Sequence, residues 1–282
     1  MSALQNLGTA HRPRRLIFTI LGGYWEVIGE WIRLRTLVQL LRDLGLGDKA
    51  ARAAIARLVD QGMLEKQPRG GDQGLAFTEA MVDRIQRRAR RIYASRQPAP
   101  LTAGWLLVSY SLPEAKRDLR HQLRSGLEQL GMRNLEAGQW IGPTRLKSDA
   151  RELADRLDAA DAVVMFVGQF EGFGHVRDLV ARCWDLDELE ARYREFIARQ
   201  QTVLAKARQA TELDPTWAYE VYTAALHGWR ILPFMDPGLP AEVLPADWPG
   251  NEGAETFFTL HELLYPAARK HVAARLAEGA GL

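Results

Sequence analysis

The stretch GLGDKAARAAIARLVDQGML, residues 45–64, runs directly into EKQPRGGDQGLAF, residues 65–77. Its apolar residues recur at helical spacing and predict a helix with one buried stripe, formed by Ala51, Ala54, Ile55, Leu58 and Val59. Off that stripe lie three basic residues and the small residues between them, namely Lys49, Arg52, Ala53, Ala56 and Arg57. Small side chains let a helix approach a wall closely while long cations reach sideways. The major groove of DNA, which phosphates line, is a wall of this kind.

A second helix is predicted just before this one. Apolar residues at helical spacing run from Leu34 to Leu41, and Gly45 ends the run, as glycine commonly does. Asp48 is expected to cap the following helix, because its carboxylate would accept the free amides of the first turn. Two helices joined by the short turn 45–47 predict a helix-turn-helix, in which the second helix enters the major groove.

A β-hairpin is predicted after the second helix. Residues 63–66 and 75–78 are expected to pair around the turn 68–72, with Arg69 at its tip. Such a hairpin is a wing, and Arg69 would reach a phosphate or the minor groove. We therefore predict a winged helix-turn-helix DNA-binding domain over residues 1–97. A winged helix that contacts only protein is the alternative.

The charge of the chain is unevenly distributed. Residues 1–97 hold 15 arginines and 2 lysines against 9 acidic residues, whereas residues 98–282 hold 20 basic and 26 acidic residues. A basic first third predicts that one end of the protein meets a polyanion. The single cysteine, Cys183, excludes an internal disulfide, and no run of residues has the character of a secretory signal or a membrane span. We therefore expect a cytoplasmic protein with no membrane partner.

Residues 98–178 predict a second domain. Apolar runs and helical segments alternate in the order β-α-β-β-α-β, beginning with the strand 105–110, which predicts a ferredoxin-like sandwich. Ser148 is expected to cap its second helix. A metal-dependent nuclease of this fold would need carboxylates at the end of the first strand, where residues 109–111 read SYS and Glu114 follows only at the helix start. That enzyme is kept as an alternative.

Residues 179–282 predict a helical C-terminal domain. Asp214 and Pro215 form a helix start, and the proline-rich segment 231–250 is expected to be a rigid, extended cover. Aromatic residues concentrate in this part of the chain. Most are expected in the core, while others would wall a pocket for a flat aromatic or acyl ligand, with an arginine that clamps its carboxylate or phosphate. The candidates for this effector site are Trp217, Trp229, Arg230 and Arg177.

No catalytic or metal-binding motif occurs in the sequence. The six histidines show neither HxxxH nor HExxH spacing, the cysteine has no CxxC partner, and neither GxSxG nor a P-loop is found. We therefore expect no catalytic residue, no metal, no cofactor and no enzymatic activity.

Three stretches occur in a distinctive order. They are PRRLIFTILGGYW with DKAARAAIARLVDQGMLE, then WLLVSYSLPEAKRDLRHQLRSGLEQLGMRNLEAGQWIGP, then GWRILPF with DPGLPAEVLPADWPG. Together they resemble the PaaX family, repressors of phenylacetate-degradation operons in bacteria. The resemblance implies an α+β protein with an N-terminal winged helix, a central domain similar to the Cas2 fold that does not cut nucleic acid, and a helical C-terminal domain. It also implies a homodimer that binds a palindromic operator and is released by an acyl-CoA thioester such as phenylacetyl-CoA.

The interpretation that follows is a dimer with two recognition helices in major grooves about one helical turn apart. The residues predicted to contact DNA are Lys49, Arg52, Ala53, Arg57 and Arg69, with Arg12, Arg14 and Arg15 of an N-terminal arm. Arg52 is the candidate to read a base edge, and the other cations would neutralise phosphates. Effector binding in the C-terminal domains is expected to change the spacing of the two heads and depopulate the operator-competent state.

Overall fold

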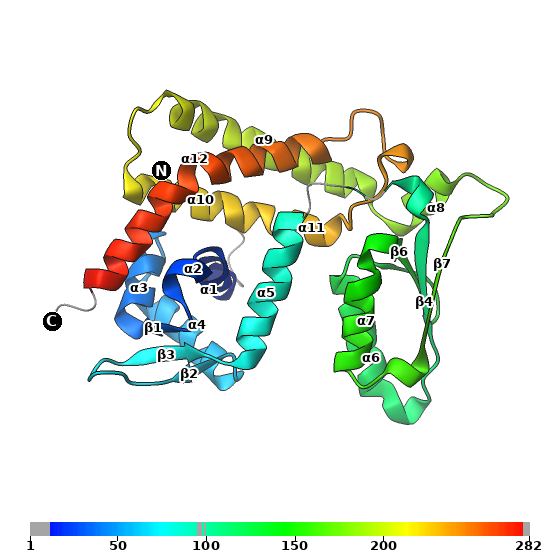
Figure 1. Cartoon of the computed structure of the whole chain (residues 1–282), viewed down its shortest axis with the longest axis horizontal. Coiled ribbons are helices and arrows are strands. Elements are labelled where there is room, and N and C mark those ends of the chain that lie inside the picture. The colour runs from blue at the N-terminus through cyan, green and yellow to red at the C-terminus, as the bar shows by residue number, and fades with distance from the viewer. Residues whose placement is uncertain (1–11, 95–97, 99, 279–282) are drawn as a thin grey trace. The chain divides into compact units, whose positions relative to one another are not determined.

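The structure is a computed structural model of the 282-residue chain, and it describes residues 12–94, 98 and 100–278. The chain packs into two compact units (Figure 1). The first combines Met1–Tyr93, Phe196–Arg230 and Gly253–Leu282, and the second combines Ala94–Glu195 and Ile231–Glu252. The C-terminal third therefore divides between the two units, and the predicted division into three sequence domains stays a prediction. None of the helices in the described ranges is long and apolar enough to cross a membrane.

The N-terminal part of the first unit has the predicted order of helix, turn, helix and hairpin. Its helices are α1 (Arg12–Gly23), α2 (Trp25–Ile28), α3 (Leu34–Asp43), α4 (Asp48–Asp60) and α5 (Glu79–Ala94). Its strands are β1 (Trp31–Arg33), β2 (Leu64–Lys66) and β3 (Gly74–Phe77), which form an antiparallel sheet in the order β1-β3-β2. The turn between α3 and α4 contains Gly45 at a φ of 79°, a conformation that glycine adopts without strain.

Helices from the C-terminal third complete the first unit. They are α10 (Pro215–Trp229), the later part of α9 (Leu186–Gln209) and most of α12 (Gly250–Glu278). α10 begins as predicted, because Asp214 accepts the backbone amide of Trp217 at 2.7 Å. α10 packs against α1, where a Cβ on Gly23 would overlap the side chain of Leu226, so the close approach of these helices requires glycine.

The core of the first unit is rich in aromatic rings. Tyr24, which follows α1, and Tyr219 of α10 are fully buried, with ring centroids 5.5 Å apart. The hydroxyl of Tyr24 forms a hydrogen bond of 2.8 Å with the hydroxyl of Thr223. Trp229 at the end of α10 stacks on Phe257 of α12, with ring centroids 5.1 Å apart. Rings of this size contribute strongly to stability when buried, and they join α10 and α12 to the N-terminal helices.

The second unit contains a four-stranded antiparallel sheet. Its strands are β4 (Trp105–Tyr110), β5 (Arg133–Glu136), β6 (Gln139–Pro143) and β7 (Val163–Gly168), in the order β5-β6-β4-β7. The helices of the βαββαβ unit are α6 (Arg117–Gln129) and α7 (Lys147–Arg156), and their residues Leu127 and Leu153 form a core with Leu106, Val108 and Trp140 of the sheet. The protein is therefore of the predicted α+β class, with a ferredoxin-like, Cas2-like sandwich.

A second apolar cluster packs on this unit. Trp105 of β4 meets Leu239 of the proline-rich segment and residues of α8 (Val176–Cys183). The proline-rich segment differs from the extended cover that we expected. It folds locally into the short helix α11 (Leu232–Met235) and a 3-10 turn at Ala241–Val243, because prolines at the start of a helical turn already have a suitable φ.

Two local predictions are wrong, and one short strand was not predicted. Gly47, not Asp48, precedes the first turn of α4, and the Asp48 carboxylate accepts hydrogen bonds from Arg42 instead of capping the helix. Ser148 lies inside the first turn of α7, which begins at Lys147 without a side-chain cap. The strand β1 is absent from the sequence prediction, since three residues are too few to show alternation and β1 forms only by pairing with β3.

Candidate nucleic-acid interface

The outward face of α4 consists of basic and small residues. Ala51, Ala54, Ile55 and Leu58 are buried, whereas Val59 is half-buried. The residues of the opposite face are all exposed, namely Lys49, Arg52, Ala53, Ala56 and Arg57. The three cations are therefore turned to solvent rather than to the interior of the first unit. Between them the helix surface carries only methyl groups, which leaves room for the wall of a DNA groove.

The start of α4 is held by an ion pair. Arg42, near the end of α3, donates from Nε and Nη2 to the two carboxylate oxygens of Asp48, at 2.8 and 2.5 Å. This bidentate pair joins the two helices across the turn. The hydrogen bond from Arg42, with a further contribution from the charge of Arg52, lowers the pKa of Asp48. Asp48 is therefore ionised at neutral pH, and its charge is already matched by Arg42.

The wing is built around the indole of Trp31. Its Nε1 donates to the carbonyl oxygen of Gln67 at 2.9 Å. The guanidinium groups of Arg33 and Arg69 lie over the same ring, 5.4 and 5.3 Å from its centroid. A Cβ on Gly74 in β3 would overlap the indole, so glycine is required for the ring to lie against the strand. Trp31 thus positions Arg69, which is exposed at the tip of the wing as predicted.

Asp72 ties the tip of the wing to the end of β1 and the start of α3. Its carboxylate accepts a hydrogen bond of 2.6 Å from Nε of Arg33 and lies 3.4 Å from Nη2 of Arg35. The hydrogen bond from Arg33 lowers the pKa of Asp72. Sequence reasoning missed Trp31, Arg33 and Arg35, because Arg33 and Asp72 are 39 positions apart and meet only through the pairing of β1 with β3.

The three arginines predicted for an N-terminal arm belong to the first turn of α1. The side chain of Arg12 lies outside the described residues. Arg14 lies over the ring of Phe18, 5.8 Å from its centroid, and Arg15 is exposed. These arginines therefore belong to the start of a helix.

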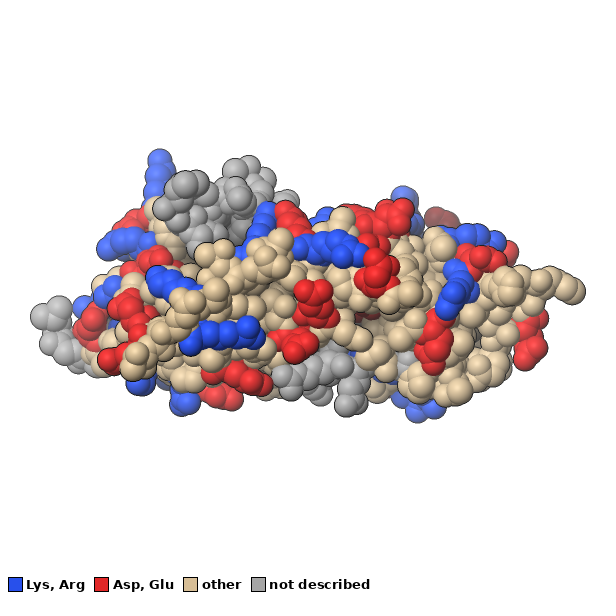
Figure 2. Space-filling view, turned by 90° about the horizontal axis from the view of Figure 1, so that it is seen from above, with Lys and Arg blue, Asp and Glu red and all other residues tan. Residues whose placement is uncertain are grey.

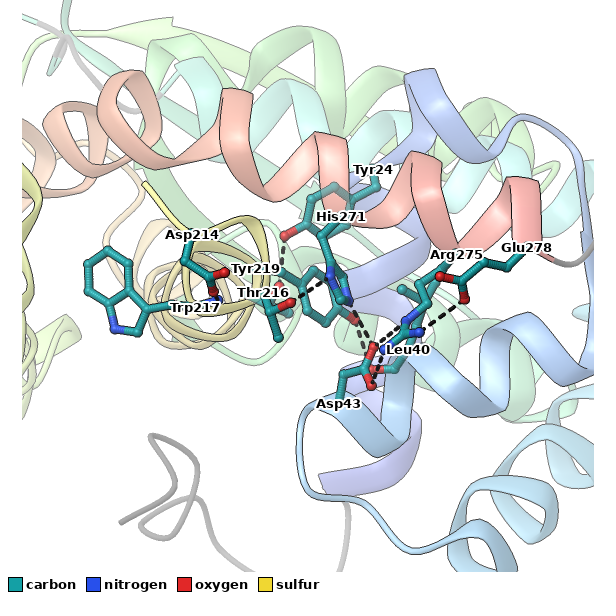
Figure 3. A network of polar contacts seen from close by, with 11 residues as sticks. Tyr24, Leu40, Asp43, Asp214, Thr216, Trp217, Tyr219, His271, Arg275 and Glu278 are labelled. Atoms are coloured by element: carbon teal, nitrogen blue, oxygen red, sulfur yellow. Dashed lines mark hydrogen bonds and ion pairs between the residues drawn. The ribbon is translucent and has the colours of Figure 1, made fainter. Parts of the chain in front are cut away.

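A polar network anchors the end of α3 (Figure 3). Asp43, the last residue of α3, accepts hydrogen bonds from Nε2 of His271 at 2.8 Å and from Nε of Arg275 at 3.0 Å, both on α12. The hydroxyl of Tyr219 on α10 donates to the carbonyl oxygen of Leu40 at 2.9 Å. Two helices of the C-terminal third thus hold the helix that precedes α4. No local sequence signal points to these contacts, since Asp43 and His271 are 228 positions apart.

Two of the predicted effector residues are tryptophans of the first unit. Trp229 is 1% exposed and is enclosed by Phe257 and Phe196. Trp217 is half-buried, and Nζ of Lys206 lies 4.2 Å from the centre of its ring. Figure 3 shows Trp217 directed away from the polar network around Asp43. Trp229 therefore serves the core, and Trp217 has a ring that is partly open to solvent.

The two predicted effector arginines belong to different units. Arg230 of the first unit donates from Nη1 to the hydroxyl of Thr19 on α1 at 2.9 Å. Arg177 of the second unit is exposed and donates from Nε to the carbonyl oxygen of Glu242 at 2.8 Å. Each arginine thus has a structural partner within its own unit, and the role of all four residues in effector binding stays a prediction.

Charges on the face shown in Figure 2 are interspersed. Basic and acidic side chains alternate there, with no extended area of one sign among the coloured residues. Along α9, Arg192 pairs with Glu188 and Arg194 with Glu190, each one helical turn away. Pairs of this kind are typical of a solvated helix face, so a polyanion has no single-sign surface to bind there.

The end of β4 carries hydroxyl side chains where a nuclease of this fold would need carboxylates. Ser109 and Tyr110 end β4, and Glu114 forms an ion pair of 3.0 Å with Arg120. Among the residues that the structure describes, no group of three or more histidine, cysteine, aspartate or glutamate side chains is arranged to hold a metal ion.

The fold and this surface define a helix-turn-helix protein joined to a Cas2-like sandwich and a helical C-terminal part. Three family descriptions match the chain along its length. They are "PaaX-like protein" over residues 12–79, "PaaX protein central Cas2-like domain" over residues 98–180, and "PaaX-like protein C-terminal domain" over residues 184–274. The chain belongs to the PaaX family, as the sequence resemblance implied.

Two individual proteins are similar to the chain over most of its length. Transcriptional repressor PaaX of Escherichia coli (strain K12) is 28% identical over 258 residues, which are 90% of this chain and 80% of that protein. The solved structure of uncharacterized protein Rv0674 from Mycobacterium tuberculosis aligns with a TM-score of 0.54 and 21% identity, over 93% of this chain and 99% of that one. The second likeness concerns the fold alone.

Proposed function

We propose that this protein is a DNA-binding transcriptional regulator that represses a catabolic operon. The exposed face of α4 carries the proposal, because Lys49, Arg52 and Arg57 project from a surface of alanines. The name of the relative in Escherichia coli, a transcriptional repressor, supports the same role. In the bound state α4 lies in the major groove. Arg52 contacts a base edge, while the other cations of α4, Arg69 on the wing and the arginines at the start of α1 contact phosphates.

The regulator acts as a homodimer on a palindromic operator. A helix-turn-helix dimer places its recognition helices about one helical turn apart, so the two-fold symmetry of the protein is matched by that of the site. The sheet of the second unit supports self-association. Its edge strand β7 contains no charged residue and exposes Val164, Phe166 and Val167, with Phe166 63% exposed. Uncharged, exposed edges pair readily with a further strand, and a second copy of β7 has the same unprotected edge to offer.

Release from the operator is caused by an aromatic acyl-CoA thioester such as phenylacetyl-CoA. A ligand shifts the protein only by its difference in affinity for the two states, and a shift from 99% to 1% bound form requires about 5.5 kcal/mol. Of the four residues that the sequence analysis assigns to the effector, Trp217 and Arg177 are accessible. Trp229 and Arg230 contribute from within the first unit by supporting the helices around them.

DNA binding by the purified protein to its own promoter tests the proposal. Arg52→Ala should lower specific affinity by about 1–3 kcal/mol and relax specificity at one base position. Arg124→Ala is the matched control, since it removes the same charge from an exposed position on α6 in the second unit, where Arg124 pairs with Glu128. It should bind like the wild type.

Salt dependence separates this function from the alternative of a protein-binding scaffold. Contacts with phosphates predict an affinity that falls steeply with added salt, because DNA releases counterions on binding. Failure to shift the promoter at low salt would contradict DNA binding. Equal affinities of wild type and Arg52→Ala would remove Arg52 from base recognition.

A further inference from the structure

A cavity of about 180 Å³ lies within the second unit. Its walls are formed by the proline-rich segment and the start of α12, together with Pro98, one residue of α9 and one residue before α7. The residues that matter here are Arg145, Tyr193, Asp236, Leu239, Leu244 and Trp248. Apolar cavities only slightly smaller, about 150 Å³, bind benzene, so the space fits one monocyclic ring.

Asp236, the acidic residue of the lining, already accepts hydrogen bonds from other residues of the cavity wall. Oδ2 of Asp236 accepts the hydroxyl of Tyr193 at 3.0 Å, and Oδ1 accepts the backbone amides of Gly238 and Leu239 at 2.8 and 3.2 Å. These three donors therefore hold the proline-rich segment around Asp236 in the conformation that keeps the cavity open. Because both of its oxygens already accept hydrogen bonds from the cavity wall, Asp236 acts as part of the frame rather than as a site for a cation.

Arg145 supplies the positive charge of the lining. Gly238 has a φ of +76°, and a Cβ there would overlap the guanidinium of Arg145, so glycine allows the arginine to lie against the loop. Burial raises the pKa of the Tyr193 hydroxyl. The nearby Asp236 raises that pKa further, whereas the positive charge of Arg145 lowers it. The guanidinium thus acts on the polar end of the cavity, where it is suited to an anionic or carbonyl oxygen.

Trp248 supplies the aromatic wall. Its ring packs edge-on against Tyr193, with centroids 6.0 Å apart. A Cβ on Gly250 would lie 2.6 Å from the indole Nε1, so this glycine also makes room for a lining side chain. The half-buried indole, together with Leu239 and Leu244, offers a flat apolar surface beside the arginine.

We propose that this cavity is the effector site and that it takes the acyl part of a monocyclic aromatic acid or of its thioester. The ring lies against Trp248, and the carboxylate or thioester carbonyl oxygen meets Arg145. The nucleotide part of a CoA ester stays outside, because one ring fills the volume. The inference rests on the proposed function, since it locates the ligand that releases the operator. It assigns direct contact with that ligand to Arg145 and Trp248, and none of the four effector candidates from the sequence, Trp217, Trp229, Arg230 and Arg177, lines this cavity.

A single helix links this cavity to the helix-turn-helix. α12 begins at Gly250, which with Asn251 lines the cavity, and continues to Glu278. Further along the same helix, His271 and Arg275 hold Asp43 at the end of α3. A ligand that changes the start of α12 therefore acts on an element that also holds α3, the helix that precedes α4. Release requires that the ligand favour one arrangement of such an element over another.

Calorimetric titration of the full chain tests the site with three probes: phenylacetate, phenylacetyl-CoA and CoA. We expect the two aryl compounds to bind and CoA alone to bind much more weakly. Arg145→Ala should weaken aryl binding by about tenfold or more, because a hydrogen bond to a charged group is lost. Ala246→Trp should abolish it, since Ala246 is exposed and lines the cavity, so a large ring there fills the space without disturbing the core.

The same variants are then assayed on promoter DNA, with Arg124→Ala as the control. Ala246→Trp should bind DNA like the wild type but resist release by the aryl ligand. If the aryl ligand released Ala246→Trp and Arg145→Ala from the promoter at the same concentrations that release the wild type, the cavity assignment would be overturned. The repressor function would be left intact. Absence of aryl binding to the wild type, or equally tight binding of CoA alone, would also overturn it. Failure of the wild type to bind DNA at all would instead contradict the proposed function.

Discussion

Helix α4 presents one of its faces to solvent, whereas helix α10 is enclosed by other elements of the first unit. On α4 the basic residues and the alanines between them are exposed, and only one stripe is buried. On α10 nine of the fifteen residues are buried, and its aromatic rings pack against Tyr24, which follows α1, and against Phe257 of α12. A helix that is apolar on one side displays its functional face in the sequence, but a helix that is apolar on most sides displays only that it is buried.

The largest effect that distinguishes the two helices is expected from Trp229→Ala. Because Trp229 is fully enclosed, its removal should destabilise the protein by about 3–5 kcal/mol, the usual cost of truncating a large core residue. Denaturant unfolding measures this change. Trp217→Ala is the control on the same helix, and it should cost far less because its ring is half-buried.

A different result would reverse the comparison. Unfolding curves of Trp229→Ala that match those of the wild type, combined with loss of effector response, would assign Trp229 to the ligand and not to the core.

A smaller effect is expected from Asp43→Ala. The substitution leaves His271 and Arg275 without the carboxylate that both contact, and an unsatisfied, partly buried polar group costs about 1–3 kcal/mol. Glu278→Ala removes an acid from the same arginine at the exposed end of the network and should cost no more than about 0.5 kcal/mol. Equal losses of unfolding free energy in the two variants would show that Asp43 does not anchor α3.

The smallest effect is expected from Arg69→Ala on the wing. Arg69 contacts a phosphate in the proposed complex, so its loss should weaken binding to all sequences alike and reduce the slope of log affinity against log salt by about one. Arg52→Ala should instead alter base preference. Binding titrations at several salt concentrations separate these outcomes. A sequence-dependent loss in Arg69→Ala would place the wing on base edges.

Much of the candidate interface could be predicted from short stretches of sequence. The alternation of buried and exposed positions along α4 follows from the helical period alone, and the glycines around Arg69 mark the turn of the wing. The cap of α10 was also predictable, since Asp214 acts on an amide three residues away. The caps proposed for Asp48 and Ser148 failed because a neighbouring arginine competes for Asp48 and because the helix containing Ser148 begins one residue earlier.

Contacts between distant residues could not be predicted in this way. Three features of this kind bring together residues from separate parts of the chain. Trp31 lies against Arg69, α12 holds Asp43 through hydrogen bonds, and the cavity is lined by Arg145 together with the proline-rich segment. Single residues such as Arg145 and Asp43 have no periodicity to reveal them.

The sequence by itself determined which faces of the helices are apolar, the βαββαβ order of the sandwich and the membership of the PaaX family. These properties depend on the periods of helix and strand and on stretches of contiguous residues. Only the tertiary structure decided which arginines are bound by distant residues, which aromatic rings are buried in the core, and where a cavity is left. The physical reason is that burial and hydrogen bonding of a side chain depend on partners brought together by the fold, and one dimension of sequence does not contain those distances.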